Sequence, residues 1–163
     1  MQPKLLKKIR TLTVFFMIML ALSGITAFPV YSELNWLKQF SIMNNSSFIS
    51  NWLNHVYYAV QDAQTRYPFL FYGYDWLAFA HLIIAALFYG VYKNPVRNKF
   101  IISWGMFCCT AVLPLAFIAG PIRGIPWQHI LIDCSFGITG IIPLAFCRRY
   151  IIQLEQLKTS TIK

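Results

Sequence analysis

Four long apolar runs, separated by shorter polar segments, dominate the pattern of hydrophobic and polar positions along the chain. They cover residues 11–30, 74–92, 100–119 and 129–147. A helix rises about 1.5 Å per residue, so about 20 apolar residues are enough to cross about 30 Å of hydrocarbon. The pattern therefore predicts an all-α, polytopic membrane protein with four transmembrane helices, organised as a single membrane domain over residues 1–163.

The first apolar run allows two interpretations. Basic residues precede it and "ITA" at residues 25–27 resembles the small-residue cleavage site of a secretory signal. The nearly unbroken apolar stretch is longer than the roughly 7–15 residues of a signal core, which favours a retained span. Cleavage would leave the other three spans and would not change which loops face which side.

The external loop expected over residues 31–73 is too polar to cross a membrane but is rich in tryptophan and tyrosine, which settle at the membrane–water interface. Within it, Ser46 or Ser47 is a suitable helix N-cap. Apolar residues then follow at helical spacing: Phe48, Trp52, Val56 and Ala59. These features predict an interfacial amphipathic helix over about residues 47–64, with His55 near its apolar–polar boundary.

Basic residues orient the spans, because they accumulate in cytoplasmic segments. With the N-terminus inside, 11 of the 14 Lys and Arg residues are cytoplasmic: Lys4, Lys7, Lys8, Arg10, Lys93, Arg97, Lys99, Arg148, Arg149, Lys158 and Lys163. Both termini and a tail over residues 148–163 are thus expected in the cytoplasm. Because the net charge of +9 follows from this topology and from contact with anionic headgroups, it does not indicate a nucleic-acid partner.

The short segment "GPIRGIP" makes the last two spans antiparallel neighbours and restricts the conformation of the turn that carries Arg123. Arg123 is therefore expected at headgroup level. It either contacts a lipid phosphate or Asp75, or it binds an anionic ligand through its planar guanidinium. Gly137 and Gly140 further predict a close approach between the last span and a neighbouring helix.

Three ionisable residues lie at overlapping depths in the outer halves of two spans. His129 and Asp133 are four residues apart and so share one helix face. A buried ionisable group needs a partner or water in hydrocarbon, which favours an arrangement in which His81 faces Asp133. This pair is either a clasp between helices or part of a functional site. Asp75 lies on another face from His81 and is expected at the interface.

Several blocks near the C-terminal end carry a resemblance: "NPVRN", "GPIRGIP", "IDCSFG", "GIIPL" and "CRRY". Across roughly the last 90 residues, the chain resembles a group of small bacterial four-span integral membrane proteins whose activity is not established. The resemblance implies a protein of the bacterial inner membrane and implies no mechanism.

These features predict an outward-facing polar pocket formed by His81, Arg123, His129 and Asp133, and they are compatible with several functions. We expect a protein that binds a small anionic or lipid-like ligand, with Asp75 and His55 as secondary candidates. Alternatives are a redox protein whose two histidines on different spans hold a haem or bind a quinone, an enzyme using His81 and Asp133 as an acid–base pair, and a non-catalytic subunit.

The bilayer and the ligand are the expected partners, and two further partners are compatible with the sequence. A chain of four spans with few intramembrane charges could form a homo-oligomer or bind another membrane protein. The cofactor is unknown and no metal site is expected, because the cysteines lack metal-binding spacing. They are expected to be buried free thiols.

Overall fold

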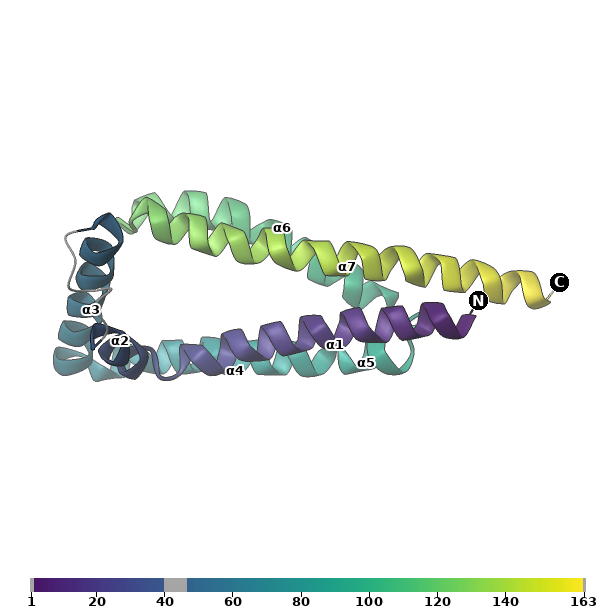
Figure 1. Ribbon diagram of the computed structural model, residues 1–163, viewed down its shortest axis with the longest axis horizontal. Coiled ribbons are helices and arrows are strands. Elements are labelled where there is room, and N and C mark those ends of the chain that lie inside the picture. Colours follow the sequence, from purple (N-terminus) through teal and green to yellow (C-terminus); the bar gives the residue numbers. More distant parts are fainter. Residues whose placement is uncertain (1, 40–46, 163) are drawn as a thin grey trace. The chain divides into compact units, whose positions relative to one another are not determined.

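The structure is a computed structural model, and it describes residues 2–39 and 47–162 (Figure 1). The described residues contain helices and no strand. Their bounds are α1 Gln2–Ala27, α2 Val30–Lys38, α3 Phe48–Arg66, the 3-10 turn η2 Pro68–Leu70, α4 Phe71–Leu87, α5 Tyr89–Lys93, α6 Lys99–Ile122 and α7 Trp127–Ile162. The expectation of an all-α fold is thereby confirmed.

Four helical segments in the described chain are long and apolar enough to cross a membrane: Gln2–Ala27, Pro68–Lys93, Lys99–Ile122 and Trp127–Ser160. Large apolar side chains project outward from all of them, for example Phe15, Phe79, Phe117 and Phe136. Such exposure suits helices that are surrounded by lipid tails, which remove the cost of leaving apolar surface uncovered. The chain therefore has the composition and helix lengths of a multi-pass membrane protein.

The first span ends next to Pro29, where the proline predicts its end, although the apolar run itself continues further. Helix α1 stops at Ala27, and Val30 already belongs to α2, whereas the run continues to residue 30. Pro29 explains the break, because it disfavours a helical conformation at the preceding residue and has no N–H to donate. Helix α2 itself was missing from our prediction, although Val30, Leu34 and Leu37 follow helical spacing.

The last helix is longer than the predicted span over 129–147. Helix α7 continues without a break to Ile162 and so includes most of the expected tail. Beyond residue 143 it contains no glycine or proline that would stop it. Four buried residues at spacings of three and four form a continuous seam along it: Leu144, Cys147, Ile151 and Leu154.

Backbone contacts divide the chain into two compact units. One combines Met1–Met19 with Ala85–Lys163, and the other is Leu20–Ile84. Helices α1 and α4 each contribute to both units. The single domain over 1–163 was predicted from the apolar runs and stays a prediction.

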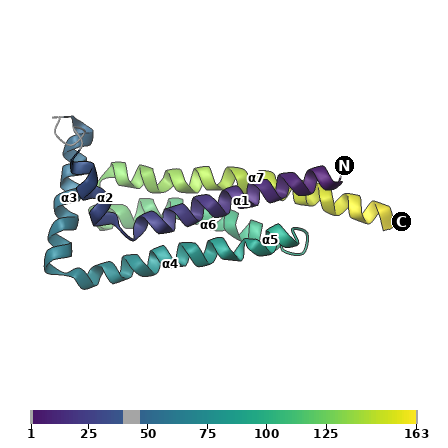
Figure 2. The ribbon, with the colours of Figure 1, turned by 60° about the horizontal axis from the view of Figure 1, so that its bottom comes forward.

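In the first unit, α6 and α7 pack side by side as an antiparallel hairpin (Figures 1 and 2). A Cβ placed at Gly137 would lie 2.5 Å from the carbonyl oxygen of Cys109, and one at Gly140 would lie 3.0 Å from the Cys109 Sγ. The two backbones can approach this closely only because both positions lack a side chain. The predicted close approach at these glycines is confirmed.

The cysteines differ in burial. Cys134 and Cys147 are buried free thiols as expected, but Cys108 is exposed and Cys109 is half-buried. The expectation is wrong for Cys108. Its neighbour Cys109 occupies the side of α6 that faces Gly137, and Cys108 is therefore turned about 100° away on the helix.

The N-terminal part of α1 also packs within this unit. The Thr13 hydroxyl lies 3.6 Å from the Cys147 Sγ, and the rings of Phe16 and Phe88 have centroids 4.8 Å apart. Closer to the N-terminus, Arg10 donates from Nε to the Tyr92 carbonyl oxygen over 3.2 Å. These contacts join α1 to α5 and α7.

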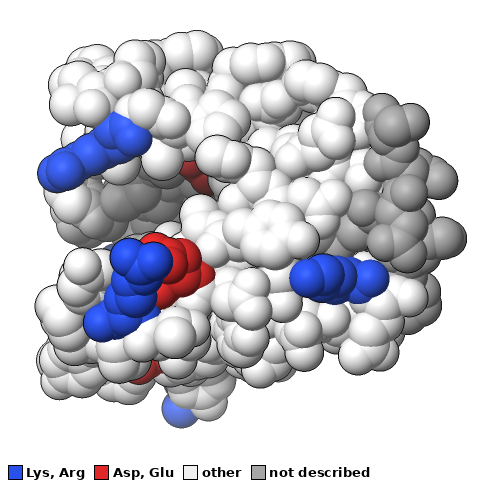
Figure 3. All heavy atoms as spheres, turned by 90° about the vertical axis from the view of Figure 1, so that its left-hand side faces the viewer, with Lys and Arg blue, Asp and Glu red and all other residues white. Residues whose placement is uncertain are grey.

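In the second unit, α2 packs against α3 around the buried side chains of Leu34 and Tyr57. The Tyr57 hydroxyl donates to Asn35 Oδ1 over 3.4 Å. The Lys38 ammonium lies 4.2 Å from the centroid of the Tyr57 ring and 5.0 Å from that of Tyr58, within the range of cation–π attraction. Figure 3 shows that charged side chains are sparse on the face it presents.

Helix α3 covers the residues predicted as helical, about 47–64, and its interfacial position stays a prediction. Ser47 is its N-cap, accepting a hydrogen bond from the Ser50 N–H over 3.3 Å. Val56 of the predicted apolar pattern packs against α2, together with Leu53, Val60 and the buried Tyr57, whereas Phe48 is 58% exposed. The undetected α2 selects this face, because its apolar residues cover Tyr57.

The glycine contact predicts a large cost for added side chains. Gly137→Ala should lower the free energy of unfolding by about 1–3 kcal/mol, because its methyl group would push α7 away from the α6 backbone. Gly73→Ala is the matched control, since a Cβ there meets no atom within 4 Å. The control should be neutral or up to about 1 kcal/mol stabilising, through better helix propensity. Unfolding in mixed micelles, followed by circular dichroism, measures both; an equal effect of the two variants would contradict the packing role.

Candidate functional site

Arg123 ends α6 in a hydrogen-bonded turn. Gly124 has φ +64°, the Ile125 N–H donates to the Gly120 carbonyl oxygen over 2.9 Å, and the Gly124 N–H donates to that of Pro121 over 3.1 Å. This is the Schellman pattern, in which a left-handed glycine closes a helix C-terminus. The turn leaves the Arg123 side chain exposed.

His129 and Asp133 lie in the first two turns of α7, which is continuous through both residues. One turn of helix separates them, so their expected common face is confirmed. Ile130 and Cys134, one position further along, are buried with Ala116 of α6. The polar pair is consequently rotated away from the α6 contact; His129 is half-buried and Asp133 is exposed.

His81 is half-buried in α4, and its Nδ1 lies 2.7 Å from the Leu77 carbonyl oxygen. A carbonyl oxygen only accepts, so Nδ1 carries the hydrogen of this bond. In the neutral ring, the Nε2 lone pair is then left to accept a proton, a hydrogen bond or a metal ion.

Gly24 of α1 is a positioning residue that the sequence interpretation missed. A Cβ there would lie 2.7 Å from the Ala78 carbonyl oxygen and 3.0 Å from the His81 Cβ. The α1 backbone thus passes directly beside His81. The run "ALSG" at residues 21–24, with three small residues, was the available signal for this close approach.

The candidate residues fall into two groups. Arg123, His129 and Asp133 all belong to the α6–α7 hairpin, whereas His81 belongs to the unit Leu20–Ile84. The pairing of His81 with Asp133, and hence the four-residue pocket, stays a prediction. The secondary candidates Asp75 on α4 and His55 on α3 are both exposed.

The chemistry available at these positions is acid–base and anion-binding chemistry. Asp133 supplies a carboxyl group, His81 and His129 supply imidazole nitrogens that can donate or accept a hydrogen bond, and Arg123 can form two parallel hydrogen bonds to a carboxylate or phosphate. No group of three or more His, Cys, Asp or Glu side chains that could hold a metal ion occurs among the residues described.

Comparison with protein-family models, with curated proteins and with solved structures finds no match to this chain.

The turn at Gly124 predicts a specific order of substitutions. Gly124→Ala should lower the free energy of unfolding by about 1–2 kcal/mol, because a Cβ is unfavourable at positive φ. Gly124→Asn should cost less, since asparagine tolerates this region better than other residues with a Cβ. A Cβ at this position meets no atom within 4 Å, so steric crowding does not contribute. Thermal unfolding in detergent compares the variants, and equal stability of all three proteins would refute the assigned turn.

Proposed function

We propose that the protein is a multi-pass protein of the bacterial inner membrane that binds a small anionic or lipid-like ligand in an outward-facing polar pocket. Its residues are His81, Arg123, His129 and Asp133. Asp133 is the observation that carries the proposal. It is exposed on a helix apolar enough to span a membrane, next to the exposed Ile132, and no ion pair joins it to any of the described residues.

A carboxylate in this setting is costly unless it faces a cation, a hydrogen-bond donor or water. A clasp with His81 alone would meet that need. A ligand site would also give Arg123 a role. Arg123 is exposed and precedes His129 by about six residues in the same hairpin. Arg123 would bind the anionic group of the ligand, while Asp133 and the histidines would bind its polar or protonated part.

One observation favours a second candidate, a haem-linked redox protein. Metal-ligating histidines usually donate their other ring N–H to a carbonyl or carboxylate, and His81 Nδ1 has such a bond to the Leu77 carbonyl oxygen. His81 and His129 would then be the axial ligands through Nε2. A reduced-minus-oxidised absorption spectrum of the purified protein separates this candidate from the first.

The orientation rests on the basic residues. Lysines and arginines gather at both chain ends and in the α5–α6 connection, which would be cytoplasmic under the positive-inside rule. The helices α2 and α3 would then lie at the outer surface. Their aromatic residues, including the exposed Trp36 and Tyr58, are of the type that anchors interfacial helices.

The topology predicts opposite results for two reporter fusions. Alkaline phosphatase fused after Lys163 should be inactive, because the enzyme needs the oxidising periplasm for its disulfides. Fusion after Gln39 should be active. Activity from the first fusion together with inactivity of the second would reverse the proposed orientation, and activity from both would place the two termini on opposite sides.

The ligand is tested by extracting and identifying, by mass spectrometry, the small molecules and lipids that co-purify with the protein. Arg123→Lys should lower the retained amount of an anionic compound about tenfold, because losing the two-pronged geometry costs about 1.4 kcal/mol. Arg66→Lys is the matched control, since Arg66 is an exposed arginine paired with Asp62 at 2.8 Å. It should retain the wild-type amount.

If His81 and Asp133 only hold two helices together and bind no ligand, a different result is expected. Asp133→Ala should then destabilise the fold, and Arg123→Lys should leave the co-purified compounds unchanged. That combination would refute the ligand site. Loss of the same compound from Asp133→Asn and Arg123→Lys, with folding intact, would support it.

A further inference from the structure

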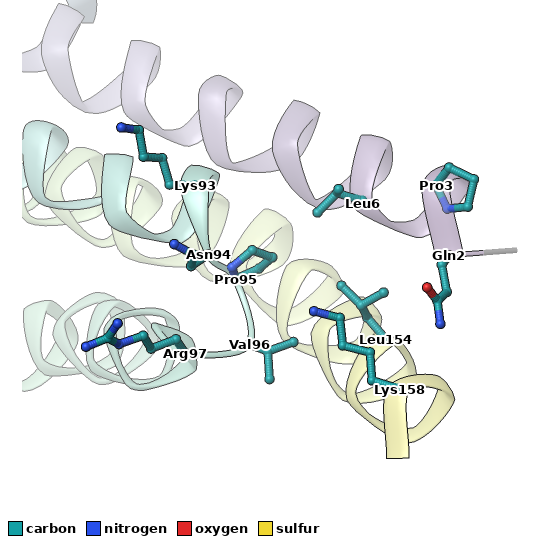
Figure 4. A pocket seen from close by; sticks show the side chains of 10 residues that line it. All are labelled: Gln2, Pro3, Leu6, Lys93, Asn94, Pro95, Val96, Arg97, Leu154 and Lys158. Atoms are coloured by element: carbon teal, nitrogen blue, oxygen red, sulfur yellow. The ribbon is translucent and has the colours of Figure 1, made fainter. Parts of the chain in front are cut away.

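A second hollow, independent of the polar pocket proposed above, lies at the other end of the α6–α7 hairpin. Its volume is about 680 Å³, within the range of ligand pockets. Figure 4 shows the side chains around it: Gln2, Pro3 and Leu6 from α1, Lys93 from the end of α5, Asn94 to Arg97 from the α5–α6 connection, and Leu154 and Lys158 from α7. All of these residues belong to the same compact unit.

The lining of this hollow is basic and contains no acid. Its charged residues are Lys93, Arg97 and Lys158. Lys158 extends from α7 toward the α5–α6 connection, whereas the Lys93 and Arg97 side chains point away from Lys158 (Figure 4). The Lys93 ammonium lies 5.2 Å from the centroid of the Tyr89 ring. Glu155, one turn before Lys158, is engaged elsewhere, because its carboxylate accepts from the Lys99 ammonium over 2.8 Å. The three cations therefore lack an acidic partner in the lining and favour an anion.

The remaining lining suits a molecule that is polar at one end and apolar at the other. The first turn of α1 borders the hollow, and the N–H groups of a helix N-terminus add to the attraction for an anion. Leu6, Val96 and Leu154 supply apolar contacts beside the charges.

A neighbouring hollow of about 520 Å³ shares Pro3 and Leu6 with the first and extends along α1, past Lys7 and Arg10, to Val14. Val14 is eight residues beyond Leu6, or about 12 Å further along the helix. This second hollow therefore continues from the charged region toward the apolar part of the span, which is the direction of a lipid's acyl chain.

We propose that this end of the protein binds an anionic phospholipid, with the phosphate in the hollow that Lys93, Arg97 and Lys158 border and an acyl chain along α1 from Leu6 to Val14. Basic hollows between the ends of membrane helices attract the phosphates of anionic lipids. Lys158 lies about 16 Å beyond residue 147, where the apolar run ends, so its amine is at or beyond headgroup level. A soluble phosphate compound would use the cations of the first hollow but not the second hollow along α1.

The test is native mass spectrometry of the full-length protein in nonionic detergent, titrated with phosphatidylglycerol, phosphatidylcholine or glycerol 3-phosphate. Phosphatidylglycerol should bind best. The triple variant Lys93→Gln, Arg97→Gln, Lys158→Gln should weaken its binding about 100-fold, since each basic side chain near the surface contributes roughly a factor of five.

The matched control removes the same charge outside both hollows. Lys4→Gln, Arg148→Gln and Arg149→Gln replace three exposed residues that line neither hollow. This triple variant should bind phosphatidylglycerol within a few-fold of the wild type. A second variant, Leu6→Trp, keeps every charge and should also weaken binding, because the indole would fill the junction of the two hollows.

Three results would overturn the proposal. Equal weakening by both triple variants would show diffuse attraction to the basic surface rather than a site. Equal binding of phosphatidylcholine would remove the requirement for net negative charge. Binding of glycerol 3-phosphate as tight as that of phosphatidylglycerol would identify a soluble phosphate compound as the occupant. None of these results depends on Arg123 or Asp133, so this test is independent of the test of the outward-facing polar pocket.

Discussion

The close approach of α6 and α7 at Gly137 is the constraint on which the structure of the larger unit depends. Helices in lipid gain nothing from burying apolar surface, because the lipid tails are as apolar as the side chains. Their association relies instead on tight van der Waals contact and polar interactions. The absent side chain at Gly137 brings the α7 backbone onto the Cys109 carbonyl group. The buried seam from Leu144 to Leu154 then continues this contact toward the C-terminus.

The spans were predictable because their signal is collective. Each apolar run has about the length that the bilayer demands, and no single residue decides the result. The helix ends were less predictable, since they depend on single residues and on tertiary contacts. The end of the first span was readable, because Pro29 stops the helix there. The end of the last helix was not, because the seam through Ile151 extends it into a stretch that hydropathy alone assigns to the tail.

The candidate site was predictable only in its local geometry. A glycine-closed turn at Arg123 and the common face of His129 and Asp133 follow from spacing and from the conformational preferences of glycine. The bond from His81 to the Leu77 carbonyl oxygen and the passage of Gly24 beside it were not readable, because they require a rotamer and a neighbouring helix. The burial of Tyr57 was missed for a related reason: α2 covers it, and α2 had not been recognised.

The unbroken length of α7 has a mechanical consequence. Its 36 residues form a rod about 54 Å long, with Asp133 near one end and Lys158 near the other. Gly137, Gly140 and Leu144 fix an intermediate stretch of this rod against neighbouring side chains or backbone. Because the helix is held between its ends, a tilt of a few degrees would move the two ends in opposite directions. Each end would move by about 1–2 Å, which is the size of the helix shifts seen in conformational switching. Pro143, inside the held stretch, is where bending would absorb that motion.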